Sequence, residues 1–305
     1  MSSDPDLRLL RYFVAVAETL HFGRAAETLF VSQPTLSSQV RKLEANLGVD
    51  LFLRDRRRVA LTDAGRLLLP PAREVLAAGE GFGAAATRLR RVARRELVVG
   101  FHVRWPHDFL PRVLRRARAS LPEMEVTLAQ HDFTDTSAGL ANGSSDVALL
   151  HLPLDLGGLQ VIEAAQEPRV AIVAEDHPLA MAGQVRVDDL AASGTPWAVP
   201  RSEDRAWRDF WGAESELRAA GIRRVGPLVE IATQEALLQQ VAGGAVLALT
   251  YRSLIATYQP GGVRALDVAG LAPGRLGIAW VEEPPGALLA GFLDAVREEL
   301  RGPTA

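Results

Sequence analysis

Residues 33–41 place short polar side chains and one arginine on a segment near the N-terminus. A carboxamide such as that of Gln33 can offer a paired donor and acceptor to adenine, while hydroxyl groups and arginine suit phosphate oxygens. Proline and threonine can also contact the methyl group of thymine. The candidates for this chemistry are Gln33, Pro34, Thr35, Ser37, Ser38 and Arg41. Together they predict a surface that contacts double-stranded DNA.

A second basic group lies between two short runs typical of strands, Leu51–Leu53 and Val59–Leu61. These runs predict a small β-wing with a basic tip, followed by a hydroxyl side chain. Charge at such a tip mainly supplies salt-dependent affinity for phosphate. The chain uses arginine almost everywhere that lysine could serve, since Lys42 is its only lysine. The arginines of this loop, taken alone, could therefore also be ordinary solvated surface residues. Beside segment 33–41, we interpret the loop as a further DNA contact. Its residues are Arg54, Arg56, Arg57, Arg58 and Thr62.

Three short helices are expected to position these side chains. Apolar residues recur at helical spacing from Leu10 to Ala17, and residues 23–30 predict a second, shorter helix. Ser32 suits an N-cap and Pro34 has no backbone donor to lose in a first turn, so a third helix should start there. Two short helices at a tight turn, the second polar outside, predict a helix-turn-helix. The apolar stripe of the third helix, expected in the core, is Leu36, Val40, Leu43 and Leu47.

A long stretch rich in alanine and leucine follows, from Thr62 to about Arg95. It predicts a helix that leads out of the basic region through the segment Arg88–Arg95. Pro70 and Pro71 interrupt its pattern. Because proline costs a helix interior about 3 kcal/mol or more, a kink or break is expected near residue 70.

From Glu96 onward, short β-like runs alternate with helical stretches, which predicts α/β layers with a largely parallel sheet. Helices are expected at residues 109–121, around 137–141 and at 287–300. A second α/β block should run from about 169 to 265, after which the chain returns to the first. The expected strands lie near residues 97–101, 126–129, 147–150, 170–173, 197–199, 228–231, 245–249 and 275–280.

Polar and aromatic side chains follow several of these strands. Ligands of α/β proteins bind beyond the carboxyl ends of the strands, where loops and helix N-termini converge. Arg104 and Arg201, on opposing lobes, could clamp a carboxylate between two guanidinium forks, which favours a small organic anion. Pairing with Asp108 or Glu203 is an equally good interpretation of these arginines. The expected ligand-binding residues are His102, Arg104, Trp105, Thr134, His151, Pro200, Arg201, Ser202 and Thr233.

Enzyme motifs are missing from the sequence: it has no Walker-type phosphate loop, no Gly-x-Gly-x-x-Gly, no nucleophile elbow and no His-Glu-x-x-His. His102 and His107 with Asp108, or His131 with Asp132, could be drawn as metal ligands or as a base with its orienting carboxylate. Single histidines near strand ends are more often hydrogen-bonded loop residues. The sequence therefore predicts no enzyme, no cofactor and no metal site.

The 305 residues carry a net charge of -3, but its distribution is uneven. Residues 1–95 hold 16 basic and 10 acidic side chains, a net of +6, whereas residues 96–305 hold 18 and 27, a net of -9. This asymmetry suggests a basic module fused to an acidic one. Cysteine is absent, which excludes disulfides and thiolate chemistry. Without a secretory signal or an apolar run that could span a membrane, a cytoplasmic protein with no membrane partner is expected.

Residues 9–66 resemble the N-terminal domain of LysR-type transcriptional regulators. The motifs that carry this resemblance are Leu10–Glu18, Arg24–Leu29, Ser32–Ser37, Leu43–Gly48 and Leu61–Gly65. The rest of the chain is compatible with the effector-binding domain of that family, through Leu110–Pro111, Leu121–Pro122, Gly143–Ala148, His177–Leu179 and Gly243–Gly244. Two positions depart from the family pattern. Ser38 stands where a longer polar or basic side chain is frequent, and Thr250 where a proline commonly ends a strand.

The resemblance implies an α/β protein with an N-terminal winged helix-turn-helix and a two-lobed effector domain of periplasmic-binding-protein type. The implied divisions are a DNA-binding domain at 1–62, a linker and dimerisation helix at 63–95, and an effector domain at 96–305, with lobe 1 at about 96–165 and 271–305 and lobe 2 at about 166–270. The implied partners are double-stranded DNA, a small-molecule effector, further copies of the chain in a homodimer or homotetramer, and RNA polymerase. Activation and repression both stay open. So do two rivals, an α/β solute-binding protein or enzyme with an oligomerisation arm, and a structural nucleoid protein.

Overall fold

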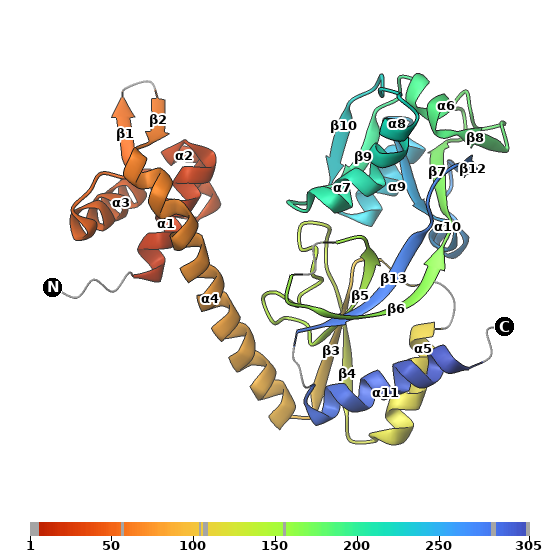
Figure 1. The fold of residues 1–305 in the computed structure, drawn as a ribbon, viewed down its shortest axis with the longest axis horizontal. Helices are drawn as coiled ribbons and strands as arrows, with labels where there is room; N and C mark the ends of the chain where they lie inside the picture. The colour runs from red at the N-terminus through yellow and green to blue at the C-terminus, as the bar shows by residue number, and fades with distance from the viewer. Residues whose placement is uncertain are drawn as a thin grey trace. The chain divides into compact units, whose positions relative to one another are not determined.

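The structure is a computed structural model that describes residues 6–55, 58–103, 105, 109–154, 157–281 and 285–302. It divides into two compact units, residues 1–85 and 86–305, each described by itself below (Figure 1). Several residues singled out from the sequence lie outside the described ones: Arg56, Arg57, Arg104, His107 and Asp108.

The three helices expected in the first unit are present. They are α1 (Leu7–Thr19), α2 (Phe22–Thr28) and α3 (Gln33–Leu47). The hydroxyl of Ser32 accepts a hydrogen bond from the backbone N–H of Thr35 at 3.2 Å, and Pro34 lies in the first turn. This cap confirms the predicted start of α3.

The core of this unit lies between α1 and α3. Phe13 of α1 contacts Phe52 edge to face, with ring centroids 5.6 Å apart, and Leu36 and Val40 of α3 are fully buried. Leu47 is 43% exposed, so its predicted place in the core is wrong. It is the last residue of α3, where the helix has already passed the packed region.

The wing is present as a two-stranded antiparallel sheet of β1 (Phe52–Asp55) and β2 (Arg58–Leu61). Helix α4 (Asp63–Ala93) follows at once and runs for 31 residues. The expected break at Pro70 and Pro71 does not occur. Each proline removes one backbone hydrogen bond, but the leucines on either side pack against the core of the first unit, which offsets that loss.

The first sheet of residues 86–305 has the strand order β4-β3-β5-β13-β6. Its strands are β3 (Glu96–Phe101), β4 (Glu125–Gln130), β5 (Val147–Leu152), β6 (Gln160–Glu167) and β13 (Gly274–Trp280). Helices α5 (Phe109–Ser120) and α11 (Ala287–Arg301) lie side by side against it (Figure 1). An ion pair joins them, because Arg116 donates to Glu299 at 2.8 Å.

The second sheet has the strand order β10-β9-β11-β7-β12-β8. Its strands are β7 (Arg169–Ala174), β8 (Gln184–Arg186), β9 (Trp197–Pro200), β10 (Leu228–Ile231), β11 (Leu247–Tyr251) and β12 (Val263–Ala269). Its helices are α6 (Val187–Ala192), α7 (Arg205–Trp211), α8 (Glu214–Ala219), α9 (Gln234–Ala242) and α10 (Arg252–Tyr258). The chain passes between the two sheets twice, from β6 to β7 at Pro168 and from β12 to β13, so each sheet belongs to one lobe.

Two predictions for this unit need correction. The sheets are mixed rather than largely parallel, because strands on either side of each crossover pair antiparallel to their neighbours. Residues 137–141 form turns and no helix. Ala138 and Gly139 have φ of 47° and 90°, in the left-handed region, which an α-helix cannot accommodate. The carboxylate of Asp135 accepts from the backbone of Gly139 at 2.9 Å and holds this turn.

Candidate DNA-binding surface and effector cavity

The outer face of α3 presents the polar side chains predicted from the sequence. Exposed on it are Gln33, Pro34, Thr35, Ser38 and Arg41, and Ser37 is half-buried. The hydroxyls of Ser32 and Thr35 lie 2.7 Å apart, so a hydrogen bond fixes the first turn. A helix with one face buried in the core and short polar groups on the other has the geometry that reads a major groove.

The strands of the wing carry Arg54 on β1 and Arg58 on β2, with Arg54 opposite Val59 in the register. Thr62 follows β2, and its hydroxyl donates to the carbonyl of Asp50 at 2.7 Å and accepts from the backbone N–H of Gly65 at 2.9 Å. A hydroxyl has a single proton. The proton of Thr62 is therefore used inside the domain, and we correct its predicted role from a phosphate donor to a cap of α4.

Glu44, which the sequence analysis missed, holds the base of the wing. Its Oε1 accepts from the backbone N–H groups of Leu51 at 3.0 Å and Phe52 at 3.3 Å, and the residue is only 7% exposed. The buried carboxylate thus ties α3 to the chain entering β1. A glutamate in a polar helix gives no sequence signal for such a role.

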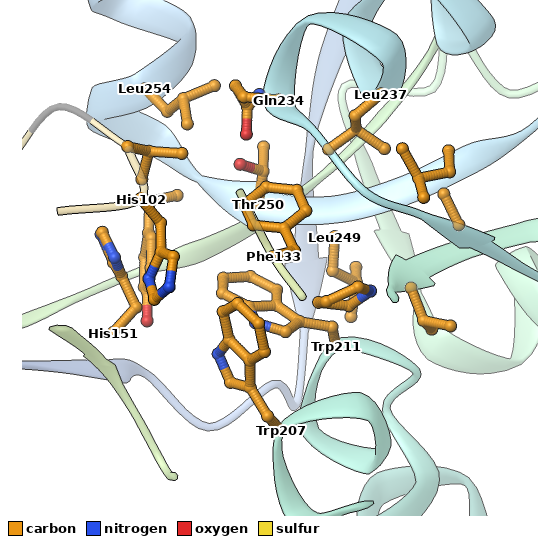
Figure 2. A pocket seen from close by; sticks show the side chains of 16 residues that line it. His102, Phe133, His151, Trp207, Trp211, Gln234, Leu237, Leu249, Thr250 and Leu254 are labelled. Carbon is orange, nitrogen blue, oxygen red and sulfur yellow. The ribbon is translucent and has the colours of Figure 1, made fainter. Parts of the chain in front are cut away.

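A cavity lies between the two sheets of residues 86–305, near the carboxyl ends of β3, β5, β9 and β11 (Figure 2). Its volume is about 40 Å³, room for only a few water molecules. The backbone N–H of Phe133, after β4, donates to the carbonyl of Ala232, after β10, at 2.7 Å. The two lobes are therefore closed on each other, and an organic ligand requires them or their side chains to open.

Three of the predicted effector residues meet at this cavity: His102, His151 and Pro200. Arg201 is exposed and does not line it. The described lining residues include no Arg, Lys, Asp or Glu. Arg201 therefore does not form the predicted clamp on a carboxylate, because its side chain is exposed to solvent.

Four other predicted effector residues have structural partners and do not line the cavity. The hydroxyl of Thr233 accepts from the backbone N–H of Ala236 at 3.1 Å and caps α9. Ser202 accepts from the backbone N–H of Asp204 at 2.9 Å. Thr134 is exposed and donates to the carboxylate of Asp132. The indole of Trp105 packs beside the ring of Phe109. These corrected residues are Trp105, Thr134, Ser202 and Thr233.

The lining beyond His102, His151 and Pro200 is mainly aromatic. Phe133, Trp207 and Trp211 contribute rings, and Gln234 contributes a carboxamide (Figure 2). Tyr251 also lines the cavity. The two tryptophans are four residues apart on α7, whose N-cap is an aspartate after a buried strand. That pattern of a capped helix with aromatic side chains on one face was the available sequence signal.

The two histidines of the cavity are held neutral by their surroundings. Burial lowers the pKa of His102, and burial together with nearby His102 lowers the pKa of His151 to about 3. Nε2 of His102 lies 2.7 Å from the carbonyl oxygen of Asp135. Because a carbonyl only accepts, Nε2 carries the proton and Nδ1 is an acceptor. His151 stacks on Tyr251, with ring centroids 4.8 Å apart.

The lowered pKa of His151 predicts acid-dependent stability. The unfolded chain binds a proton at His151 below pH 6.5, whereas the folded chain resists it down to about pH 3, so stability falls as pH drops through this window. Going from about pH 7.5 to about pH 5.5 should cost about 1.4 kcal/mol through this residue. Urea unfolding of the wild type and of His151→Gln at both pH values measures it. An equal loss in the two proteins would contradict the assignment.

His131 lies in an arrangement that resembles a catalytic triad. Its Nε2 is 3.2 Å from the hydroxyl of Ser145, and its Nδ1 is 3.3 Å from the carboxylate of Asp135, rather than of Asp132 as the sequence suggested. Ser145 has no exposed surface, so no substrate can reach its hydroxyl. The group instead fixes the turn that follows β4. Among the described residues, no cluster of three or more histidine, aspartate or glutamate side chains could hold a metal ion.

Comparison with protein families accounts for both units. Residues 7–66 match the bacterial regulatory helix-turn-helix protein family of lysR type, and residues 90–301 match the LysR substrate binding domain. The chain belongs to the LysR family of transcriptional regulators. The resemblance drawn from the sequence is thereby confirmed, as is the combination of a helix-turn-helix with a two-lobed α/β domain.

Relatives of this LysR-type chain cover its full length. It is 32% identical to the Hca operon transcriptional activator HcaR of Escherichia coli K12 over 303 residues, 98% of this chain and 100% of that protein. It is 30% identical to the regulator IlvR of Caulobacter vibrioides over 302 residues, 98% of this chain and 99% of that protein. The crystal structure of CbnR, a LysR family transcriptional regulator, matches with 28% identity and a TM-score of 0.52, covering 96% of this chain and 100% of CbnR.

Membership in the LysR family also decides between the classes of function. The family consists of transcriptional regulators, which bind DNA and carry an effector-binding domain, and not of enzymes. The rival interpretation of an α/β enzyme with an oligomerisation arm is therefore wrong. Within the described part of the chain, no helix combines the length and apolar character that crossing a membrane requires.

Proposed function

We propose that this LysR-family regulator recognises a specific operator through α3 and responds to a small molecule bound in the cavity between its lobes. The observation that carries the proposal is the outer face of α3, where short polar groups are exposed on a helix whose other face is buried. We assign residues 1–62 to DNA binding, 63–95 to the linker and 96–305 to effector binding. Because its target is DNA, we place the protein in the cytoplasm.

At the DNA, the carboxamide of Gln33 pairs with adenine in the major groove, and Pro34 and Thr35 contact thymine methyl groups. Ser37, Ser38 and Arg41 contact phosphates, together with the wing residues Arg54, Arg56, Arg57 and Arg58. The structure of CbnR with its target DNA, 27% identical with a TM-score of 0.51, supports DNA as the partner of the whole chain. RNA polymerase is a further proposed partner, since a regulator bound beside a promoter lies within its reach.

Self-association is proposed through α4. Val75, Phe82 and Leu89 are exposed on this helix and are spaced seven residues apart. Apolar residues at that spacing form the seam of a coiled coil. We propose a homodimer joined along this seam, and a homotetramer built from two dimers. Its half-sites would then lie on one face of the duplex, separated by whole turns of about 10 base pairs.

Control by the effector is proposed to act through the closure of the two lobes. In the closed form, Phe133 and Ala232 are hydrogen-bonded across the cavity. A ligand that binds one arrangement of the lobes better than another shifts their populations, and only that difference in affinity can change DNA bending or the placement of the dimers.

The experiment is footprinting of the full-length protein on the promoter region beside its own gene, over a salt series, with unrelated DNA as competitor. Phased, protected half-sites with affinity falling steeply as salt rises are expected. Protection that unrelated DNA competes away equally would overturn sequence-specific regulation in favour of an architectural role.

Gln33→Ala should reduce affinity for the protected operator by about tenfold or more, because a bidentate base contact is worth about 1–3 kcal/mol. Binding to unrelated DNA should hardly change. Asn46→Ala is the matched control, since it removes an exposed carboxamide near the other end of α3. Equal operator affinity of the two variants, measured by fluorescence anisotropy, would remove Gln33 from the recognition surface.

A further inference from the structure

Four buried polar atoms of residues that line the cavity have no hydrogen-bond partner among the described residues: Nδ1 of His102, the indole nitrogen of Trp207, Nε2 of Gln234 and the hydroxyl of Tyr251. The rings of His102 and Trp207 lie together, with centroids 5.2 Å apart (Figure 2). Since Nε2 of His102 donates to the carbonyl of Asp135, Nδ1 accepts, whereas an indole N–H only donates. The cavity therefore offers an acceptor on His102 and a donor on Trp207, in two rings that lie together, and further donors on Gln234 and Tyr251.

The surroundings of this pair are uncharged. The described lining consists of aromatic and aliphatic side chains with a carboxamide and a threonine, and without an acidic or basic residue beyond the two neutral histidines. A carboxylate has no proton to give to Nδ1 of His102. Its charge would also be buried without a cation among the described lining residues, which is strongly unfavourable. An uncharged group that both accepts and donates fits these two atoms.

We infer that the effector is an uncharged aromatic molecule bearing a carboxamide, or a similar group with adjacent carbonyl and N–H. Its carbonyl accepts the indole proton of Trp207, its N–H donates to Nδ1 of His102, and its ring packs against Phe133 and Trp211. This inference rests on the proposed function, because it takes the cavity to be the effector site. It replaces the small organic anion that the sequence favoured.

Benzamide and benzoate test the inference, because they have nearly the same shape and differ in charge. Calorimetric titration of the full-length protein at about pH 7.5 should show benzamide binding about tenfold or more tightly than benzoate. Benzamide affinity should stay nearly constant down to about pH 6, because the carboxamide of benzamide does not titrate between about pH 7.5 and about pH 6. Tighter or equal binding of benzoate, or binding of neither compound, overturns the inference.

Trp207→Phe removes the N–H and keeps an aromatic ring. It should weaken benzamide binding about tenfold, because the carbonyl of the ligand then lacks its donor. Trp280→Phe is the matched control: its indole nitrogen is also buried without a partner among the described residues, but Trp280 does not line the cavity. Unchanged benzamide affinity in Trp207→Phe overturns the pairing, and so does an equal loss in Trp280→Phe.

The outcomes separate this inference from the proposed function. Benzoate binding that is stronger than benzamide binding and is lost in Trp207→Phe would keep the cavity as the effector site and overturn only the ligand class. A footprint without specific half-sites would overturn the proposed function. That experiment contains no ligand, so its result does not depend on the inferred ligand class.

Discussion

Asp146→Asn should lower the free energy of unfolding of residues 86–305 by about 3 kcal/mol, because it breaks a buried ion pair. One carboxylate oxygen accepts from Arg91 at 2.7 Å, and the other accepts from the backbone N–H of Val98 at 2.8 Å. The two charged side chains are only 11% and 9% exposed. Losing the negative charge leaves the guanidinium of Arg91 buried and uncompensated.

Asp294→Asn is the control for Asp146→Asn. Its pair with Arg297, at 2.9 Å, has side chains 68% and 42% exposed, so its loss should change stability by less than about 0.5 kcal/mol. Urea unfolding of the two variants measures the difference. If Asp146→Asn proves as mild as Asp294→Asn, the pair does not fasten the end of α4 to β3. A double variant, Arg91→Met with Asp146→Asn, should recover much of the stability, because it removes both charges and keeps an acceptor for the backbone N–H of Val98.

Glu44→Ala should destabilise the N-terminal unit by about 2–4 kcal/mol. It leaves the backbone N–H groups of Leu51 and Phe52 buried without the acceptor they now share, at about 1–3 kcal/mol each. Because this carboxylate joins α3 to the wing, operator affinity should fall together with the unfolding midpoint.

Glu44→Gln separates the hydrogen bonds of this residue from its charge. It keeps an acceptor oxygen and should recover most of the stability, whereas Glu27→Ala, at an exposed position of α2, should have an effect within about 0.5 kcal/mol. Thermal unfolding and operator titration of the three variants provide the measurements. Loss of operator binding in Glu44→Ala without loss of stability would show that Glu44 acts on DNA directly.

Acidic side chains fill both of these buried positions, and neither was singled out from the sequence. A glutamate in the polar helix α3 and an aspartate before β5 both look like surface residues until the backbone groups that they accept from are placed. Hydrogen bonding to distant backbone N–H groups leaves no periodic signal, because Glu44 and Leu51, or Asp146 and Val98, belong to different elements.

Local signals predicted the start of α3 and its exposed polar face well. Ser32 and Pro34 specify the start of α3 through their own backbone chemistry. The exposure of Ser38 follows from its place opposite Leu36 and Val40, and that of Gln33 from its place at the first residue of the helix. The same kind of signal failed at Pro70 and Pro71. There, packing of the neighbouring leucines outweighs a local preference to end the helix.

The sequence by itself determined the helix-turn-helix, the wing, the alternation of strands and helices, and the membership of the LysR family, because each depends on residues close together in the chain. Only the tertiary structure decided the character of the effector cavity. Its lining comes from sixteen described residues of both lobes, spread from His102 to Leu254. Closure brings together Trp207 and His102 and leaves Arg201 in solvent. Strand ends predict which loops surround a ligand. Which of their side chains turn inward depends on packing between segments more than 100 residues apart.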